Sequence, residues 1–299
     1  MKPALAAARS VAVINHLTVH PRVAFTLSEL SAELRVSPAS LSAVLRALTD
    51  TGYLLRHPRL KTYSLGPALV AVGHSAAMSH PVVELARPEM AALAELASEC
   101  VGSAVVGDEI IILAVEGGVS AVTRELRVGQ RLPLIPPYGP VFLAWSSRDR
   151  VDQWLSRVPA EGDGLRPALE RTLAVVRDRG YAVVLENDQV AAVQALADQS
   201  AREPWNEELR DRLRAAIPEQ ADEYSIDEID EKEEYAVSII AAPVFGVDSS
   251  VVYALTLQGF TRLSGSEVIA IGNRLAMTCR VLTRSLGGRM PVPVEAASK

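Results

Sequence analysis

Two short helix signals follow each other between residues 26 and 52, with only a few residues between them. Thr26 is a good N-cap, and Glu29 three residues later completes a capping box. Ser37 followed by Pro38 marks a second start, because the first helical position does not need its N–H. Gly52 ends this second helix, since glycine adopts the left-handed conformation at little cost. Two capped helices joined by a tight turn predict a helix-turn-helix.

Apolar residues at helical spacing predict how these helices pack. A further helix is expected before them, ending at His20-Pro21, because proline does not continue a helix. In each helix the apolar residues recur every three or four positions, which predicts one buried face per helix. The three faces are Val11, Ile14 and Leu17; Leu27, Leu30 and Leu34; and Leu41, Val44, Leu45 and Leu48.

The outer face of the third helix and the segment after it suit DNA. Small side chains let a helix approach the floor of the major groove, and hydroxyl and guanidinium groups contact bases and phosphates. Two short apolar stretches, Tyr53–Leu55 and Tyr63–Leu65, flank a basic tip and predict a two-stranded wing. The predicted DNA-binding residues are Ser37, Ala39, Ser40, Ser42 and Arg46 in the groove, with Arg56, Arg59 and Lys61 on the phosphates.

Charge is unevenly distributed along the chain. The formal net charge is −6, yet residues 1–80 contain eight Lys and Arg residues against three Asp and Glu residues. A basic head on an acidic body is typical of a nucleic-acid reader joined to a domain of another kind. The alternative is a three-helix packing unit with no ligand and an ordinary solvated surface.

Beyond the wing the sequence predicts a connecting helix and then an α+β domain. The helix is expected from Ala68 to Ser79, and its apolar residues suit either a contact with a second copy or packing within the chain. An amphipathic helix carrying Leu85, Met90, Leu93 and Leu96 follows Pro81. Strands are expected around a Gly107-Asp108 turn, at 121–126, at 181–186, at 235–246 and at 249–259. Ser264 and Glu267 form a capping box that opens a last helix to about Leu286.

Several function classes find little support. All five histidines fall within residues 1–80, away from any nucleophile of the larger region, and no H-E-x-x-H, C-x-x-C or Walker motif occurs. Glu186 and Asp188 are paired acids at a strand end and are expected to face solvent. Catalysis, a metal and a cofactor are therefore not expected. No long apolar run occurs, and Cys100 and Cys279 share no metal spacing, so a cytoplasmic protein is expected.

Five segments carry a family resemblance through their order and spacing. They are "FTLSELSAELRVSPASLSAVLRALTDTGYLLRHPRLKTYSLG", "HPVVELARPEMAALAE", "LRVGQRLPL" with Gly129, Pro133 and Leu134, "VRDRGYAV", and "IIAAPVFGVDSSVVYALTLQG". Together they resemble the IclR family of bacterial transcription regulators over nearly the whole chain. The resemblance implies a winged helix-turn-helix at 1–66, a linker helix at 67–80 and a GAF-like α/β effector-binding domain at 81–288. The chain departs from the family by an acidic insertion at about 189–234. This insertion is expected to be a solvated segment, and the alternative is a lid over the pocket or a contact with a partner. A disordered tail at 289–299 completes the division.

The resemblance also implies partners and a site. The partners are an inverted-repeat DNA operator, a second copy in a homodimer or tetramer acting as a repressor, and a small-molecule effector. The family's polar anchors are absent here: Ile135, Pro136, Pro137 and Tyr138 precede Gly139-Pro140, and Ile239 stands where a Cys is frequent. The effector is then apolar or large, or the domain has lost sensing and serves oligomerisation or protein contact. The predicted effector residues are Ser103, Val105, Leu134, Ile135, Pro137, Tyr138, Gly139, Glu186 and Ile239.

Overall fold

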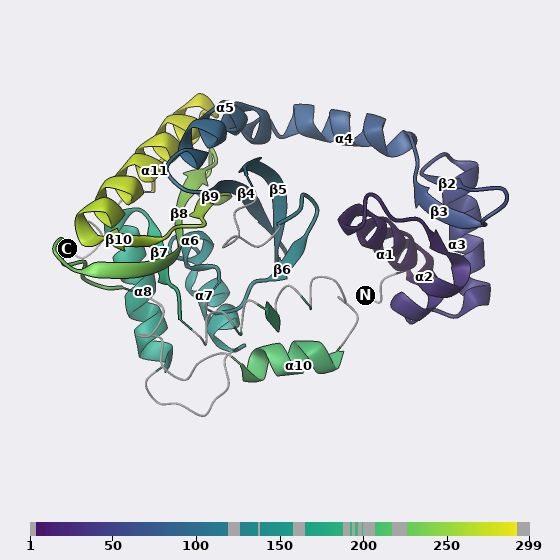
Figure 1. The fold of residues 1–299 in the computed structure, drawn as a ribbon, viewed down its shortest axis with the longest axis horizontal. Coiled ribbons are helices and arrows are strands. Elements are labelled where there is room, and N and C mark those ends of the chain that lie inside the picture. The colour runs from purple at the N-terminus through teal and green to yellow at the C-terminus, as the bar shows by residue number, and fades with distance from the viewer. Residues whose placement is uncertain are drawn as a thin grey trace.

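A small N-terminal head and a larger body are joined by one exposed helix in the computed structural model (Figure 1). The structure describes residues 4–118, 126–136, 138–157, 165–187, 192, 195–196, 199, 207–216 and 226–291. Among these residues, no helix is both long and apolar enough to cross a membrane. The strand expected at 121–126 falls almost wholly outside the described residues, as does most of the expected tail.

The head is a winged helix-turn-helix, as predicted. Its elements in chain order are α1 (Leu5–Val19), β1 (Phe25–Thr26), α2 (Leu27–Glu33), α3 (Pro38–Asp50), β2 (Leu54–Arg56) and β3 (Thr62–Leu65). β3 lies between β1 and β2 in a small antiparallel sheet. The capping box at Thr26 and Glu29 is confirmed. Ser37 occupies the N-cap position of α3, but its side chain makes no capping hydrogen bond.

The head core follows the predicted stripes on α2 and α3 and departs from them on α1. Leu30, Leu41 and Leu45 are fully buried. On α1 the prediction is wrong for Val11, which is 55% exposed, whereas Val13 is fully buried. The buried face of α1 consists of Ala12, Val13, His16 and Leu17. This face contains a histidine, so the apolar periodicity alone pointed to a face rotated away from the real one.

Helix α4 (Ala68–Ser79) has the predicted bounds and buries no residue. Val70 and Met78 are each 74% exposed, so packing of this helix within the chain is not observed. The next helix, α5 (Val82–Ala94), packs through Val82, Ala86, Met90 and Leu93. Leu85 was expected on that face, but it is 43% exposed because it lies at the edge of the face.

The body is built on one antiparallel sheet. Its strands are β4 (Glu99–Val106), β5 (Glu109–Gly117), β6 (Arg131–Pro133), β7 (Ala182–Leu185), β8 (Glu234–Phe245), β9 (Val251–Gln258) and β10 (Arg262–Ser264). Their order is β10-β8-β9-β4-β5-β6, with β7 also paired to β8. The predicted turn at Gly107-Asp108 joins β4 to β5, and Gly107 has a φ of 61°.

Helices cover both faces of this sheet (Figure 1). One face packs against α5 and α11 (Gly265–Ser285), whose capping box at Ser264 and Glu267 is confirmed. The other face packs against α6 (Pro140–Leu143), α7 (Arg148–Leu155) and α8 (Leu165–Arg179). Consecutive residues of β8 serve the two cores, Ile240 on the first face and Ala241 on the second. The fold class is therefore α+β, as predicted.

The acidic insertion is more closely packed than expected. Its helix α10 (Glu207–Ala215) buries Leu209 and Leu213, and Leu213 joins the core beside α8. Ile226 is 6% exposed and belongs to the core on the other face of the sheet. The run "DEIDEKEE" itself is mostly exposed, in agreement with its charge. Leu209 and Leu213 are four residues apart, as on one face of a helix, whereas Ile226 belongs to no helical period.

Candidate functional site

The outer face of α3 is accessible. The stripe Leu41, Val44 and Leu45 holds the helix on the head core. The residues predicted to contact DNA in the groove lie on the other side, where Ser37, Ala39, Ser42 and Arg46 are exposed and Ser40 is half-buried. Their positions correspond to the face that a recognition helix presents to the major groove.

The wing carries three exposed cations beside this helix. Its tip is closed by hydrogen bonds from the His57 amide to the Thr62 carbonyl (2.8 Å) and from the Lys61 amide to the His57 carbonyl (2.9 Å). Arg56 lies over the ring of Tyr63, 5.8 Å from the ring centroid. Among the described residues, no salt bridge involves Arg56, Arg59 or Lys61. These cations are therefore available to phosphate groups.

A cavity of about 470 Å³ lies in the body, between the sheet and the segment that leads into α6. Its walls are mostly apolar, and several polar side chains reach it. The apolar lining includes Val101, Ile110, Ile112, Leu126, Leu132, Val141, Phe142, Ala182, Val184, Val237, Ile239, Ala241 and Phe260. The polar lining consists of Ser103, Tyr138, Glu186, Ser238, Thr256, Gln258, Thr261 and Arg262. This combination is typical of a small-molecule site.

The predicted effector residues are only partly brought together. Ser103, Tyr138, Gly139, Glu186 and Ile239 line the cavity. Leu134 and Ile135 are buried in the core beside it, and Val105 packs against that core. Pro137 lies outside the described residues. The segment 134–139 thus has two parts: its first residues pack, and Tyr138 and Gly139 face the cavity.

Sequence reasoning missed the polar groups supplied by β9 and the turn into β10. Thr256 and Gln258 alternate with the buried Leu255 and Leu257, so their spacing of two placed them on the cavity face. This alternation was the signal that could have identified them. The side-chain amide of Gln258 donates a hydrogen bond to the carboxylate of Glu99. Burial of Glu99 raises the pKa of this carboxyl above its ordinary value, although the bond from Gln258 opposes the shift.

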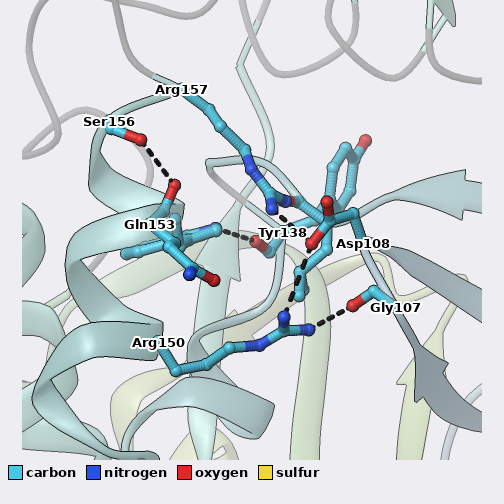
Figure 2. Close-up of polar contacts among 9 residues, drawn as sticks. Gly107, Asp108, Tyr138, Arg150, Gln153, Ser156 and Arg157 are labelled. Carbon is cyan, nitrogen blue, oxygen red and sulfur yellow. Dashed lines mark hydrogen bonds and ion pairs between the residues drawn. The ribbon is translucent and has the colours of Figure 1, made fainter. Parts of the chain in front are cut away.

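A polar brace holds the Tyr138 segment in place (Figure 2). Trp154 Nε1 donates to the Tyr138 carbonyl at 3.1 Å, and Arg157 Nη1 donates to the Leu134 carbonyl at 2.7 Å. Arg157 also forms an ion pair with Asp108, and Arg150 approaches the same carboxylate at 3.4 Å. The brace therefore ties α7, the β4–β5 turn and the segment next to the cavity together. Because these residues are far apart in sequence, no local pattern predicted it.

The two cysteines are buried and are not placed to act as nucleophiles. Cys100 and Cys279 are buried, and this burial raises the pKa of Cys100 to about 12 and that of Cys279 further. The nucleophilic thiolate is therefore scarce near neutral pH. In the described part of the chain, no group of three or more His, Cys, Asp or Glu side chains could hold a metal ion.

Comparison with known proteins shows that the chain is similar to bacterial transcription regulators. Residues 74–198 match the family model "Bacterial transcriptional regulator IclR C-terminal". The HTH-type transcriptional regulator XynR of Escherichia coli (strain K12) is 23% identical over 271 residues, which cover 87% of this chain and 89% of XynR.

Two solved structures share the fold. An IclR transcriptional regulator from Alicyclobacillus acidocaldarius has a TM-score of 0.66 at 21% identity, covering 96% of this chain and 100% of that one. An IclR homologue from Microbacterium hydrocarbonoxydans, solved with 4-hydroxybenzoate, has a TM-score of 0.63 at 20% identity, covering 94% and 99%. Together with the winged head and the α+β body, these matches show that the chain is similar to the IclR family of bacterial transcription regulators.

Proposed function

We propose that the chain is a ligand-responsive regulator, in which the head binds an operator and the cavity of the body binds a small-molecule effector. The single observation that carries this proposal is the cavity of about 470 Å³, which lies in the same chain as a winged head with an accessible α3. We assign DNA binding to residues 1–66, the linker to 67–80 and effector binding to 81–288.

On the DNA side, two copies of the chain place their α3 helices in successive major grooves of an inverted repeat. Two-fold symmetry in the protein then corresponds to two-fold symmetry in the operator. Ser37, Ala39, Ser40, Ser42 and Arg46 contact the groove in this proposal. Arg56, Arg59 and Lys61 contact phosphates and make the affinity depend on salt. The apolar, exposed face of α4 is the proposed contact between the two copies.

On the effector side, the cavity suits a largely apolar molecule with one polar end. Apolar side chains from β4, β5, β7 and β8 form most of the wall, and β4, β8, β9 and β10 each add at least one polar residue to it. The relative from Microbacterium hydrocarbonoxydans, which has this fold, was solved with 4-hydroxybenzoate. Aromatic and aliphatic acids are therefore the first ligands to test. An effector changes operator binding only through its different affinity for the two states of the dimer.

Loss of sensing is the second candidate function. The segment before Gly139 is apolar, and Leu134 and Ile135 are fully engaged in the core. If this segment serves only packing, the body contributes dimerisation or contact with another protein. The two functions make different predictions about the cavity, because only the first requires that a ligand enter it.

The test begins with selection of genomic DNA fragments by the purified protein at a stated salt concentration. An enriched inverted repeat supports the regulator, and absence of any enrichment contradicts specific operator binding. A panel of carboxylic acids beginning with 4-hydroxybenzoate is then titrated by calorimetry into the wild type and into Thr256→Phe, which reduces the cavity. Binding that is lost in the variant supports effector binding. Binding that is unchanged in the variant places the ligand elsewhere.

A further inference from the structure

The head and the body touch at a second place, away from α4. The turn at residues 127–130 leads into β6 and approaches the C-terminal end of α1. Arg127 Nη1 donates a hydrogen bond to the Val19 carbonyl at 3.3 Å. A Cβ built on Gly129 would lie 2.3 Å from Thr18 Cγ2 and 3.5 Å from Thr18 Cβ. The backbone of the turn is thus packed directly against α1, which in Figure 1 is the helix of the head that faces β5 and β6.

The same turn is fixed to the wall of the cavity. The Gly129 amide donates to the Ile112 carbonyl at 2.8 Å, and the Ile112 amide donates to the Gln130 carbonyl at 2.9 Å. The side chain of Ile112 lines the cavity, as do Leu126 before the turn and Leu132 after it. A molecule that fills the cavity therefore meets the side chains of three residues. The main chain of Ile112 is hydrogen-bonded to this turn, and Leu126 and Leu132 lie before and after it in the sequence.

This contact does not cover the face that is proposed to bind DNA. Thr18 and Val19 end α1, whereas the predicted groove residues of α3 are exposed. The contact therefore fixes the orientation of the head and leaves α3 accessible.

We propose that the turn at residues 127–130 is an intramolecular docking surface for α1, and that filling the cavity loosens this contact. Only the nature of the molecule that fills the cavity rests on the proposed function. Side chains pushed outward at Ile112, Leu126 and Leu132 displace the turn from Thr18. The head is then free to turn about α4. The docked and released states would present α3 in two orientations.

The experiment is a disulfide-trapping measurement on the full chain. The double variant Thr18→Cys with Gly129→Cys brings two Cβ atoms to about 3.5 Å, at the short end of the disulfide range. Under a fixed oxidant we expect rapid formation of an intrachain bond, seen as a faster-migrating monomer on a non-reducing gel. Each single variant measures the background, and the native Cys100 and Cys279 are buried. No cross-link, or a covalent dimer in its place, overturns docking within one chain.

A cavity-filling substitution then tests the coupling without any ligand. Ser103 lines the cavity and pairs with Ile112 across β4 and β5. Adding Ser103→Phe to the double variant should slow cross-linking by at least about five-fold, the lower end of typical coupling between sites. Val106→Phe is the matched control, because Val106 lies on the same strand and is 57% exposed. An unchanged rate in a folded Ser103→Phe protein overturns the coupling.

A second variant avoids any change at Gly129, whose φ of 86° disfavours other residues. Thr18→Lys places a long cation against the turn and beside Arg127. Small-angle scattering should then show a larger radius of gyration than the wild type, because the head is released. An unchanged radius contradicts the docking surface. None of these measurements uses DNA or an effector, so their failure is distinct from failure of the proposed function.

Discussion

Gly272 in α11 lies against the ring of Tyr181, and a Cβ added to this glycine would be 2.3 Å from Cε2 of the tyrosine. Tyr181 is 1% exposed, so the ring has little room to move. Alanine is favoured over glycine in a helix by about 1 kcal/mol, but overpacking of a core costs about 1–3 kcal/mol. We expect Gly272→Ala to lower the free energy of unfolding by up to about 2 kcal/mol in urea denaturation.

The matched control for this substitution is Gly73→Ala in α4. Apart from the backbone of its own helix and its chain neighbours, no atom of the described residues lies within 4 Å of the added Cβ at that position. Only helix propensity then distinguishes the variant from the wild type. The free energy of unfolding of Gly73→Ala should rise by up to about 1 kcal/mol or stay unchanged. If Gly272→Ala is as stable as the wild type, the packing of Tyr181 against α11 is looser than described.

Arg46 provides the sharpest test of base reading. It is exposed on α3, opposite the buried stripe. If it contacts a base, Arg46→Ala should weaken binding to the selected operator by about 1–3 kcal/mol, with little effect on random DNA. Arg59→Ala on the wing is the control, because a phosphate contact weakens both DNAs and reduces the salt dependence by about one unit. Fluorescence anisotropy at several salt concentrations measures both. Equal losses on the two DNAs for Arg46→Ala would mean that it is a phosphate contact.

His16 should make the head sensitive to acid. It is 4% exposed, and its Nε2 has no hydrogen-bond partner among the described residues. Burial, followed by repulsion from His20, lowers the pKa of His16 to about 4. Because this pKa lies below the ordinary 6.5, protonation favours the unfolded state. The contribution of neutral His16 to the free energy of unfolding is fully present above pH 6.5. As the pH falls toward 4, the free energy of unfolding decreases by up to about 3 kcal/mol.

Hydrogen exchange of peptides from residues 4–66, corrected for the intrinsic pH dependence of exchange, measures this loss between pH 7 and pH 5. His16→Leu removes the titrating group and should flatten the profile. A wild-type head that is equally protected at both pH values would show that the ring is hydrated and titrates normally.

The two arginines that contact Asp108 should contribute unequally to the free energy of unfolding. Arg157 has a side chain 20% exposed and donates to the carbonyl of the buried Leu134, whereas Arg150 is 32% exposed and donates to the carbonyl of Gly107 in an exposed turn. Arg157→Gln should lower the free energy of unfolding by about 1–2 kcal/mol, because it leaves a partly buried carbonyl without its donor. Arg150→Gln should cost less than about 1 kcal/mol, as exposed ion pairs do. Urea denaturation compares them, and an equal loss would show that Asp108 alone is responsible.

Capping residues predicted where helices begin. Contacts between residues distant in sequence decided which face of α1 is buried and which residues line the cavity. The caps at Thr26 and Ser264 begin helices where expected, because each cap satisfies amide groups of its own first turn. The face of α1 could not be read correctly, since it contains His16, whose burial depends on packing with Phe25. The pairing of β9 with β4 places Thr256 opposite Val101 and Gln258 opposite Glu99, so that Thr256 and Gln258 join the cavity lining. No local period in the sequence contains this pairing.

Helix α4 has a geometric consequence for the distance between two heads. It is 12 residues long and every one of them is at least partly exposed, so no residue of this helix is buried against the body of its own chain. At 1.5 Å per residue it forms a lever arm about 18 Å long, and a tilt of about 10° at its base moves its far end by about 3 Å. That displacement is close to the ~3.4 Å rise of one base pair. A small rotation at the base of α4 thus moves the head by about the rise of one base pair.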